Sequence, residues 1–138
     1  MRLASLVKVG ICLVVVALVM PALRAQAPAN ETATQFYTRY LTALGKATAI
    51  DQITPLLSAD MVKQITSTPA DQRPMMFGMI KDMAGMNTNV KVTKETPNAK
   101  GATLAATATG MDGKPVKGTI EVMKEGGAWK LGKESWSN

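Results

Sequence analysis

Histidine is absent from this chain, and cysteine occurs once, at Cys12, inside an apolar N-terminal run. The rest of the chain therefore has neither a disulfide partner nor the cysteine and histidine spacing of a zinc site. Aromatic residues make up only 4% of the sequence. Neither a glycine-rich phosphate loop nor a nucleophile elbow is present. These absences exclude the enzyme and metal-binding classes that short motifs identify most clearly.

The first 27 residues have the layout of a secretory signal peptide. Arg2 and Lys8 form a basic start, the apolar run Val9–Met20 follows, and small residues come next. The letters A-Q-A at 25–27 fit the cleavage pattern, and a cut two residues to either side fits as well. Because the uncharged stretch is shorter than the roughly 20 residues of a bilayer span, we predict removal rather than a retained membrane anchor.

Residues 28–138 are then expected to form a single domain in the periplasm or outside a bacterial cell. An exported protein without disulfides is more typical of bacteria than of animal extracellular modules. Once the first 27 residues are removed, thirteen basic residues face ten acidic ones, a net charge of +3. The lysines are scattered with few aromatic residues among them, so we expect no nucleic-acid partner and, after cleavage, no membrane association.

The first part of the domain has a helical period of apolar residues. One arc, starting at Ala33, is apolar over the stretch that predicts the first helix; it includes Phe36, Tyr37, Tyr40 and Leu44. Caps and a proline divide the segment after this helix into shorter pieces.

Four residues of that segment carry the local signals. Thr48 with Asp51 resembles a capping box, in which Asp replaces the usual Glu. Pro55 should kink or end the helix that follows, because proline lacks the amide donor. Ser58 can cap a short second helix.

A third helix is expected to open just after Thr68, and five of the ten methionines lie within positions 75–86. Met76, Met79 and Met83 lie near the centre of a wide apolar face, as in a helix buried on a sheet. Methionine fills irregular gaps in a core well, so core or pocket lining is the favoured interpretation. The alternative is a copper(I) site, because thioethers are soft ligands. We expect little or no copper binding, since sulfurs that face a sheet cannot converge on an ion.

After Gly85 the apolar period changes from 3.6 residues to 2, which predicts strands. Turn residues cluster over 97–101, 112–113 and 126–127 and separate four strands. The strands should therefore form an antiparallel meander.

The last strand contains a parity conflict between its two tryptophans. Trp129 and Trp136 fall on opposite sides of a regular strand, so burying both requires a bulge near Gly132. The complete pattern predicts an α+β fold, in which N-terminal helices pack on a curved antiparallel sheet of about four strands.

Three stretches resemble the nuclear transport factor 2-like superfamily, with its cystatin-like α+β cone, and small exported bacterial members in particular. They are FYTRYLTAL over 36–44, the passage over 45–65 with its Leu-Leu-Ser, and GTIEVMKEGGAWKLGKESW over 118–136. The resemblance covers most of residues 33–137. The superfamily includes isomerases, dehydratases and many ligand-binding or interaction domains. Its enzymes place Asp–His or Tyr–Asp pairs inside the cone, and the lack of histidine excludes the first kind.

The pocket candidates are aromatic and methionine side chains of the first and third helices: Tyr37, Tyr40, Met76, Met79 and Met83. We interpret the tyrosines as core residues whose hydroxyls are satisfied at the rim; alternatively, one hydroxyl donates to a ligand. Asp51 and Asp82 are the carboxylates nearest to apolar helical faces. We interpret Asp51 as a cap and Asp82 as a solvated residue, because a general base needs a positioned partner.

The favoured function is that of a non-enzymatic exported domain. It is expected to bind a small apolar ligand or a protein partner, including a second copy that meets it through the sheet. One alternative is a cone-fold isomerase or dehydratase that uses a tyrosine and an aspartate, and a second is methionine-based copper(I) binding. No cofactor and no resident metal are expected.

Overall fold

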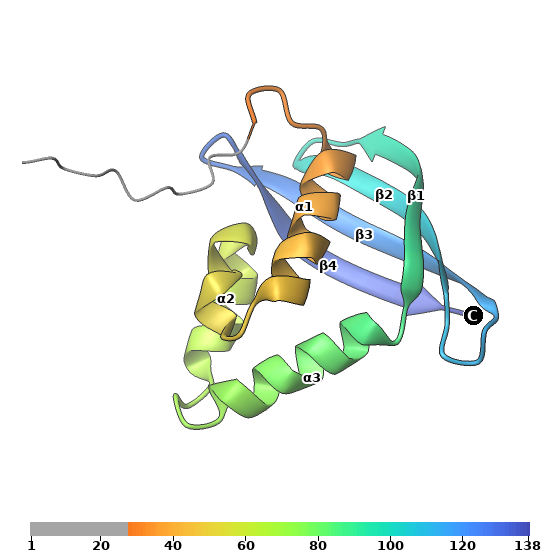
Figure 1. The fold of residues 1–138 in the computed structure, drawn as a ribbon. Coiled ribbons are helices and arrows are strands. Elements are labelled where there is room, and N and C mark those ends of the chain that lie inside the picture. The colour runs from red at the N-terminus through yellow and green to blue at the C-terminus, as the bar shows by residue number, and fades with distance from the viewer. Residues whose placement is uncertain (1–27) are drawn as a thin grey trace, which may run out of the picture.

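The computed structural model describes residues 28–138, in which three α-helices precede a four-stranded antiparallel sheet (Figure 1). The elements in chain order are α1 (Ala33–Lys46), the 3₁₀ turns η1 (Ile50–Gln52) and η2 (Thr54–Leu56), α2 (Ala59–Ser67), α3 (Arg73–Gly85), β1 (Thr88–Pro97), β2 (Gly101–Thr109), β3 (Pro115–Glu125) and β4 (Ala128–Ser137). The strands lie side by side in sequence order, as a meander. The predicted α+β class is confirmed, whereas the predicted signal peptide falls outside the described residues.

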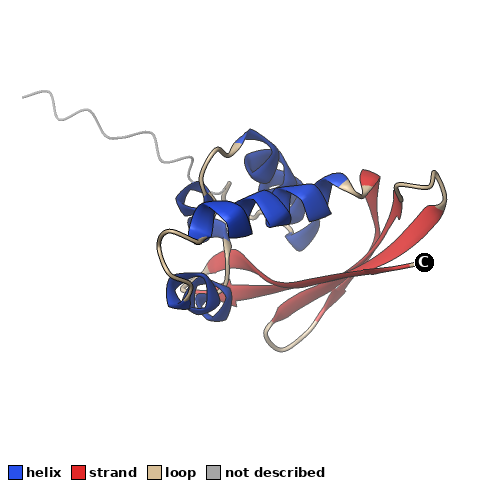
Figure 2. Cartoon of the chain, turned by 90° about the horizontal axis from the view of Figure 1, so that it is seen from below, coloured by secondary structure: helices blue, strands red, loops and turns tan. Residues whose placement is uncertain are grey.

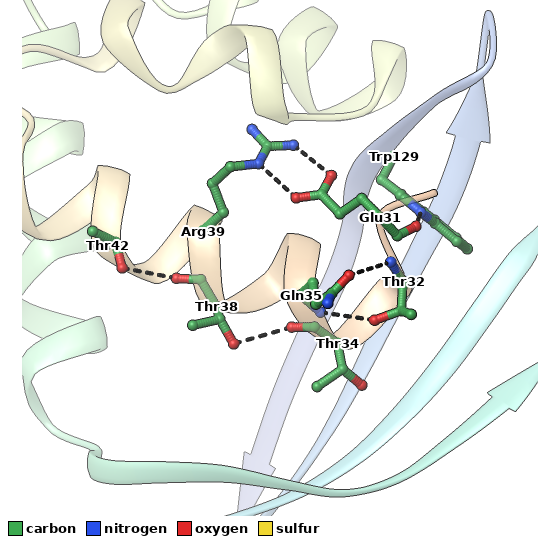
Figure 3. Close-up of polar contacts among 8 residues, drawn as sticks. All are labelled: Glu31, Thr32, Thr34, Gln35, Thr38, Arg39, Thr42 and Trp129. Atoms are coloured by element: carbon green, nitrogen blue, oxygen red, sulfur yellow. Dashed lines mark hydrogen bonds and ion pairs between the residues drawn. The ribbon is translucent and has the colours of Figure 1, made fainter. Parts of the chain in front are cut away.

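Helix α1 begins at a complete capping box. The Thr32 hydroxyl accepts the Gln35 amide N–H at 3.2 Å, and the Gln35 side chain accepts the Thr32 amide N–H at 2.9 Å (Figure 3). The predicted apolar arc of α1 is buried, and Phe36 is fully enclosed. Because α1 contacts β1, β2 and β4, this arc forms the helical side of the core.

The chain just before α1 is tied to the sheet. Glu31 pairs with Arg39 through two contacts, at 2.7 and 2.8 Å, and the Glu31 carbonyl accepts the indole N–H of Trp129 at 2.7 Å (Figure 3). The Glu31 side chain is nearly buried, so this ion pair is better shielded from water than a surface pair. The start of α1 is thereby fixed against β4.

The segment between α1 and α2 differs from the prediction at its cap. Thr48 exchanges hydrogen bonds with Gln52, at 2.9 and 3.2 Å, and Asp51 is exposed. The segment forms two 3₁₀ turns, and Pro55 lies in the first positions of η2. This agrees with the predicted helix break at the proline. Ser58 caps α2 as predicted and accepts an amide N–H of its first turn at 3.4 Å.

Helix α3 starts later than predicted. It begins at Arg73, after a turn over residues 69–72, and Gln72 at its N-cap makes no side-chain capping bond. The Thr68 hydroxyl donates instead to the Gln64 carbonyl of α2, at 3.3 Å. Thr68 therefore ends α2 as its C-cap and does not cap the start of α3.

The predicted turns and the predicted bulge are present in the sheet. All three turn clusters lie between strands, and Gly126 and Gly127 have positive φ angles of 58° and 79°, the left-handed region that favours glycine. Glu121 pairs with Lys133 but Val122 pairs with Leu131, which leaves Gly132 as the extra residue. This bulge allows both tryptophans to pack against the core.

The core lies where α1 meets the inner residues of the sheet, and in Figure 2 the helices lie on one side of the strands. Leu104 and Ile120, on the two central strands, are fully buried there. Strand β1 lies at an edge and is mostly exposed. None of the helices within residues 28–138 has the length and apolar character needed to cross a lipid bilayer.

Candidate functional site: a groove between α1, α3 and the sheet

A groove of about 410 Å³ opens between the end of α1, the end of α3, the start of β1 and the end of β4. Apolar side chains form most of its wall: Leu41, Leu44, Ala84, Val90 and Trp136. Its polar side chains are Lys81, Asn87 and Glu134. Grooves of this size, with apolar walls and a few polar groups, are typical binding sites for small molecules.

Glu134 is the carboxylate of this groove and is half-buried. Its Oε1 accepts the Tyr37 hydroxyl at 2.7 Å and the Trp136 indole N–H at 2.7 Å. Within residues 28–138, no protein group donates to Oε2. One oxygen is therefore held in place by two donors, while the other can accept a hydrogen bond from a bound molecule.

The bulge at Gly132 explains why Glu134 points into the groove. Side chains alternate between the two faces of a strand, and one extra residue reverses the order after it. Leu131, before the bulge, and Glu134, after it, therefore share the inner face. Glu134 pairs with Ile120 of β3, which is fully buried.

Trp136 can pack against the sheet because the residue opposite it has no side chain. It pairs with Gly118 of β3, and a Cβ atom at residue 118 would lie 2.6 Å from the indole ring. Any other residue at this position would push the ring away from the sheet. The glycine thus lets Trp136 lie flat beside Glu134.

Both predicted tyrosines are buried on α1, with their rings stacked at 6.2 Å between centroids. Burial and, next in importance, the negative charge of Glu134 raise the pKa of Tyr37 and of Tyr40 well above the ordinary value of a phenol. At neutral pH each is an uncharged donor. Tyr37 uses its hydroxyl to position Glu134, and neither tyrosine is among the residues lining the groove.

Lys81 supplies a positive charge at the groove wall. Its ammonium donates to the Ala47 carbonyl at 2.8 Å and lies 5.7 Å from the centre of the Phe77 ring. The Ala47 carbonyl follows the C-terminus of α1, where the helix dipole favours a cation. Lys81 is therefore anchored by α1 and holds α3 to it.

The prediction that the central methionines of α3 are buried is wrong for Met79 and Met83. Met76 is half-buried against the core, but Met79 and Met83 are 56% and 64% exposed. The face of α3 that packs inward carries Phe77, with Ile80 and Ala84 beside it. The inward face of α3 is therefore centred on Phe77, and Met79 and Met83 remain in solvent.

Among the predicted pocket methionines, Met83 alone lines a hollow that adjoins the groove. That hollow, of about 350 Å³, also contains Met86, Glu134 and Trp136. Met76 and Met79 are not among the residues that line it or the groove.

The two candidate aspartates do not meet a tyrosine. Asp51 and Asp82 are exposed, and neither lines the groove. Asp51 borders a separate hollow beside Arg73. The structure pairs Tyr37 with Glu134 instead, so a carboxylate–tyrosine pair exists at a different position from the one considered.

Sequence reasoning missed Glu134, although a signal for it was present. The bulge needed to bury both tryptophans also turns every residue after Gly132 to the opposite face, which makes Glu134 an inner-face residue. Lys81 gave no such signal, because its partner is a backbone carbonyl of another helix.

Residues 28–138 contain no group of three or more His, Cys, Asp or Glu side chains placed to hold a metal ion. No known family model, curated protein or solved structure matches this chain. The resemblance to the nuclear transport factor 2-like superfamily therefore stays a prediction, and the chemistry of the groove carries the functional proposal.

Proposed function

We propose that this chain is an exported, non-enzymatic domain that binds a small apolar molecule in the groove beside Glu134. The observation that carries the proposal is a half-buried carboxylate at the groove wall, with one oxygen fixed by two donors and the other without a protein donor within residues 28–138. A poorly solvated acceptor gains from a partner, and apolar walls hold the body of a ligand. The ligand class is therefore an apolar molecule that carries one hydrogen-bond donor, such as an amine or a hydroxyl.

N-phenyl-1-naphthylamine is a suitable probe, because it is apolar, carries one N–H donor and fluoresces more strongly when it leaves water. The full chain should raise its fluorescence in a saturable titration. Ala84→Phe should fill the groove and weaken binding, whereas Ala105→Phe, on the exposed side of β2, should leave it unchanged. Glu134→Gln should weaken binding as well, since it removes the charge at nearly constant volume. Equal binding by the parent and the Ala84 variant would contradict the proposal.

A second candidate function is proton transfer, favoured by the 2.7 Å contact between Tyr37 and Glu134. An uncharged phenol that donates to a carboxylate of an apolar groove resembles an acid–base pair. The probe is 5-nitrobenzisoxazole, from which a carboxylate removes the ring C–H proton as the N–O bond breaks. Turnover that Glu134→Gln abolishes would favour the enzyme, and a rate equal to that of free acetate would favour the binding domain.

We further propose that the domain is a cone of the nuclear transport factor 2-like kind, with a curved sheet, and that residues 1–27 are removed on export. The order of helices and strands supports the first part, and the basic and apolar layout of the N-terminus supports the second. Protein recovered from an expressing bacterium should begin between Gln26 and Asn30 by mass measurement. An intact N-terminus would contradict export with cleavage.

A second copy that meets the sheet is the protein partner we propose. The outer face of β3 is exposed and carries Lys117, Thr119 and Glu121. Sedimentation velocity should then find a dimer that Thr119→Arg splits, because Thr119 lies on a central strand. A monomer at all concentrations would contradict this partner.

A further inference from the structure

Three features of the groove indicate which class of donor it binds, and the first is the charge of Glu134. Its Oε1 accepts the Tyr37 hydroxyl and the Trp136 indole N–H, each at 2.7 Å, and both of these donors are uncharged. Within residues 28–138, neither oxygen of Glu134 forms an ion pair with a basic side chain. The negative charge is therefore oriented by the protein but not neutralised by it, so a bound cation can supply the missing partner.

The second feature is the ring of Trp136, which lies with one face on β3. A Cβ atom at Gly118 would lie 2.6, 2.6 and 2.7 Å from three consecutive carbons of the six-membered ring. Such similar distances place this Cβ position over the face of the ring and not beyond its edge. The opposite face is turned away from β3, and the ring lines both the groove and the adjoining hollow. The face of an indole is electron-rich and attracts cations within about 6 Å.

The third feature is the engagement of Lys81, the basic side chain of the groove wall. Its ammonium donates to the Ala47 carbonyl at 2.8 Å and to the Gly45 carbonyl at 3.5 Å, both at the C-terminal end of α1. It also lies 5.7 Å from the centre of the Phe77 ring. The charge of Lys81 is therefore bound to α1, where the helix dipole favours it, and does not pair with Glu134.

We propose that the ligand of the groove is a primary ammonium ion on a short apolar body, bound by the Glu134 carboxylate and the outward face of Trp136. This inference rests on the proposed binding function and narrows its ligand from any single donor to a cation. A charge-assisted hydrogen bond is roughly twice as strong as a neutral one. An alcohol of the same shape can donate to Glu134 but gains neither the ion pair nor the cation–π contact. Leu41, Leu44 and Val90 supply the apolar wall for the body of the ligand.

The test compares 2-phenylethylammonium with 2-phenylethanol, which share one apolar body and differ only in the donor. Each compound is titrated into the full ¹⁵N-labelled chain, and its dissociation constant is obtained from the shifts of the indole N–H signals. The parent should bind the ammonium compound at least about tenfold more tightly than the alcohol, a difference of about 1.4 kcal/mol. Glu134→Gln removes the charge at nearly constant volume and should reduce this preference to about threefold or less, the part that the Trp136 contact supplies.

Glu121→Gln, on the exposed outer face of β3, is the matched control and should keep the preference of the parent. Binding of 2-phenylethanol by the Glu134 variant shows that its groove is intact; if that variant unfolds, the comparison of the two compounds in the parent decides alone. A parent that binds the ammonium compound no more tightly than the alcohol, or a folded Glu134 variant that keeps the tenfold preference, would overturn the inference. If the parent still raises the fluorescence of N-phenyl-1-naphthylamine, the proposed binding function stands, and if it does not, both fail.

Discussion

Helices α1 and α3 are alike in length, at 14 and 13 residues, but they use their apolar surfaces differently. Helix α1 opens with a capping box and buries five residues, whereas α3 has no side-chain cap and buries only Phe77. Both helices have a wide apolar arc in the sequence. In α1 the arc meets the sheet, and in α3 most of its methionines remain in solvent.

The difference teaches that the partner surface decides how much of an apolar arc becomes core. Helix α1 packs across β1, β2 and β4, where fully buried residues such as Leu104 receive it. Helix α3 contacts η1 through its inner face and borders the groove at its end. Helix α3 therefore buries few of its side chains, and most of its methionines remain exposed.

The largest effect should come from truncating one core residue of α1. Phe36→Ala removes a fully enclosed ring and should lower the free energy of unfolding by about 3–5 kcal/mol. Met79→Ala, on the exposed face of α3, should change it by less than about 0.5 kcal/mol. Urea denaturation of both variants measures the contrast. Similar losses would mean that the two helices are buried alike.

At alkaline pH, the two buried tyrosines of α1 should lower the stability of the folded protein. Because the pKa values of Tyr37 and Tyr40 are raised in the folded state, both states keep these protons below about pH 10, and the full stabilisation is present there. Above it the unfolded chain loses its protons first, so stability falls by about 1.4 kcal/mol per pH unit for each tyrosine. Urea denaturation at several alkaline pH values should give a shallower slope for Tyr37→Phe. An unchanged slope would contradict the burial of this phenol.

The smallest effect concerns the two helix starts. Thr32→Ala removes the cap of α1 and should cost about 1 kcal/mol. Gln72→Ala, at the corresponding position of α3, should cost nearly nothing, since its side chain makes no capping bond. Thermal melts of the two variants give the comparison. A larger loss for the Gln72 variant would show that α3 depends on its own start.

Much of the fold could be predicted because it depends on local chemistry. The apolar arc of α1, the Ser58 cap, the turn residues and the parity of Trp129 and Trp136 are all readable within one element. The bulge at Gly132 followed from that parity. Such signals need no knowledge of the neighbouring element.

The remainder depends on contacts between distant segments. Which part of the apolar arc of α3 is buried depends on the space beside η1 and the sheet, so Phe77 took the place predicted for Met79. The bulge turns Glu134 to the inner face, but the hydrogen bond that it accepts from Tyr37, 97 residues away in the sequence, follows from no local pattern. The sequence contains Tyr37 and Glu134, but its pattern does not predict that they contact each other.

Oxidation of individual methionines by dilute hydrogen peroxide, followed by peptide mass spectrometry, tests the contrast between α1 and α3 most directly. Exposed thioethers oxidise faster than enclosed ones. Met79 and Met83 should react nearly as fast in the folded protein as in urea, together with the exposed Met111, while the half-buried Met76 should be protected. Protection of Met79 and Met83 equal to that of Met76 would place them in the core and contradict the difference described between α1 and α3.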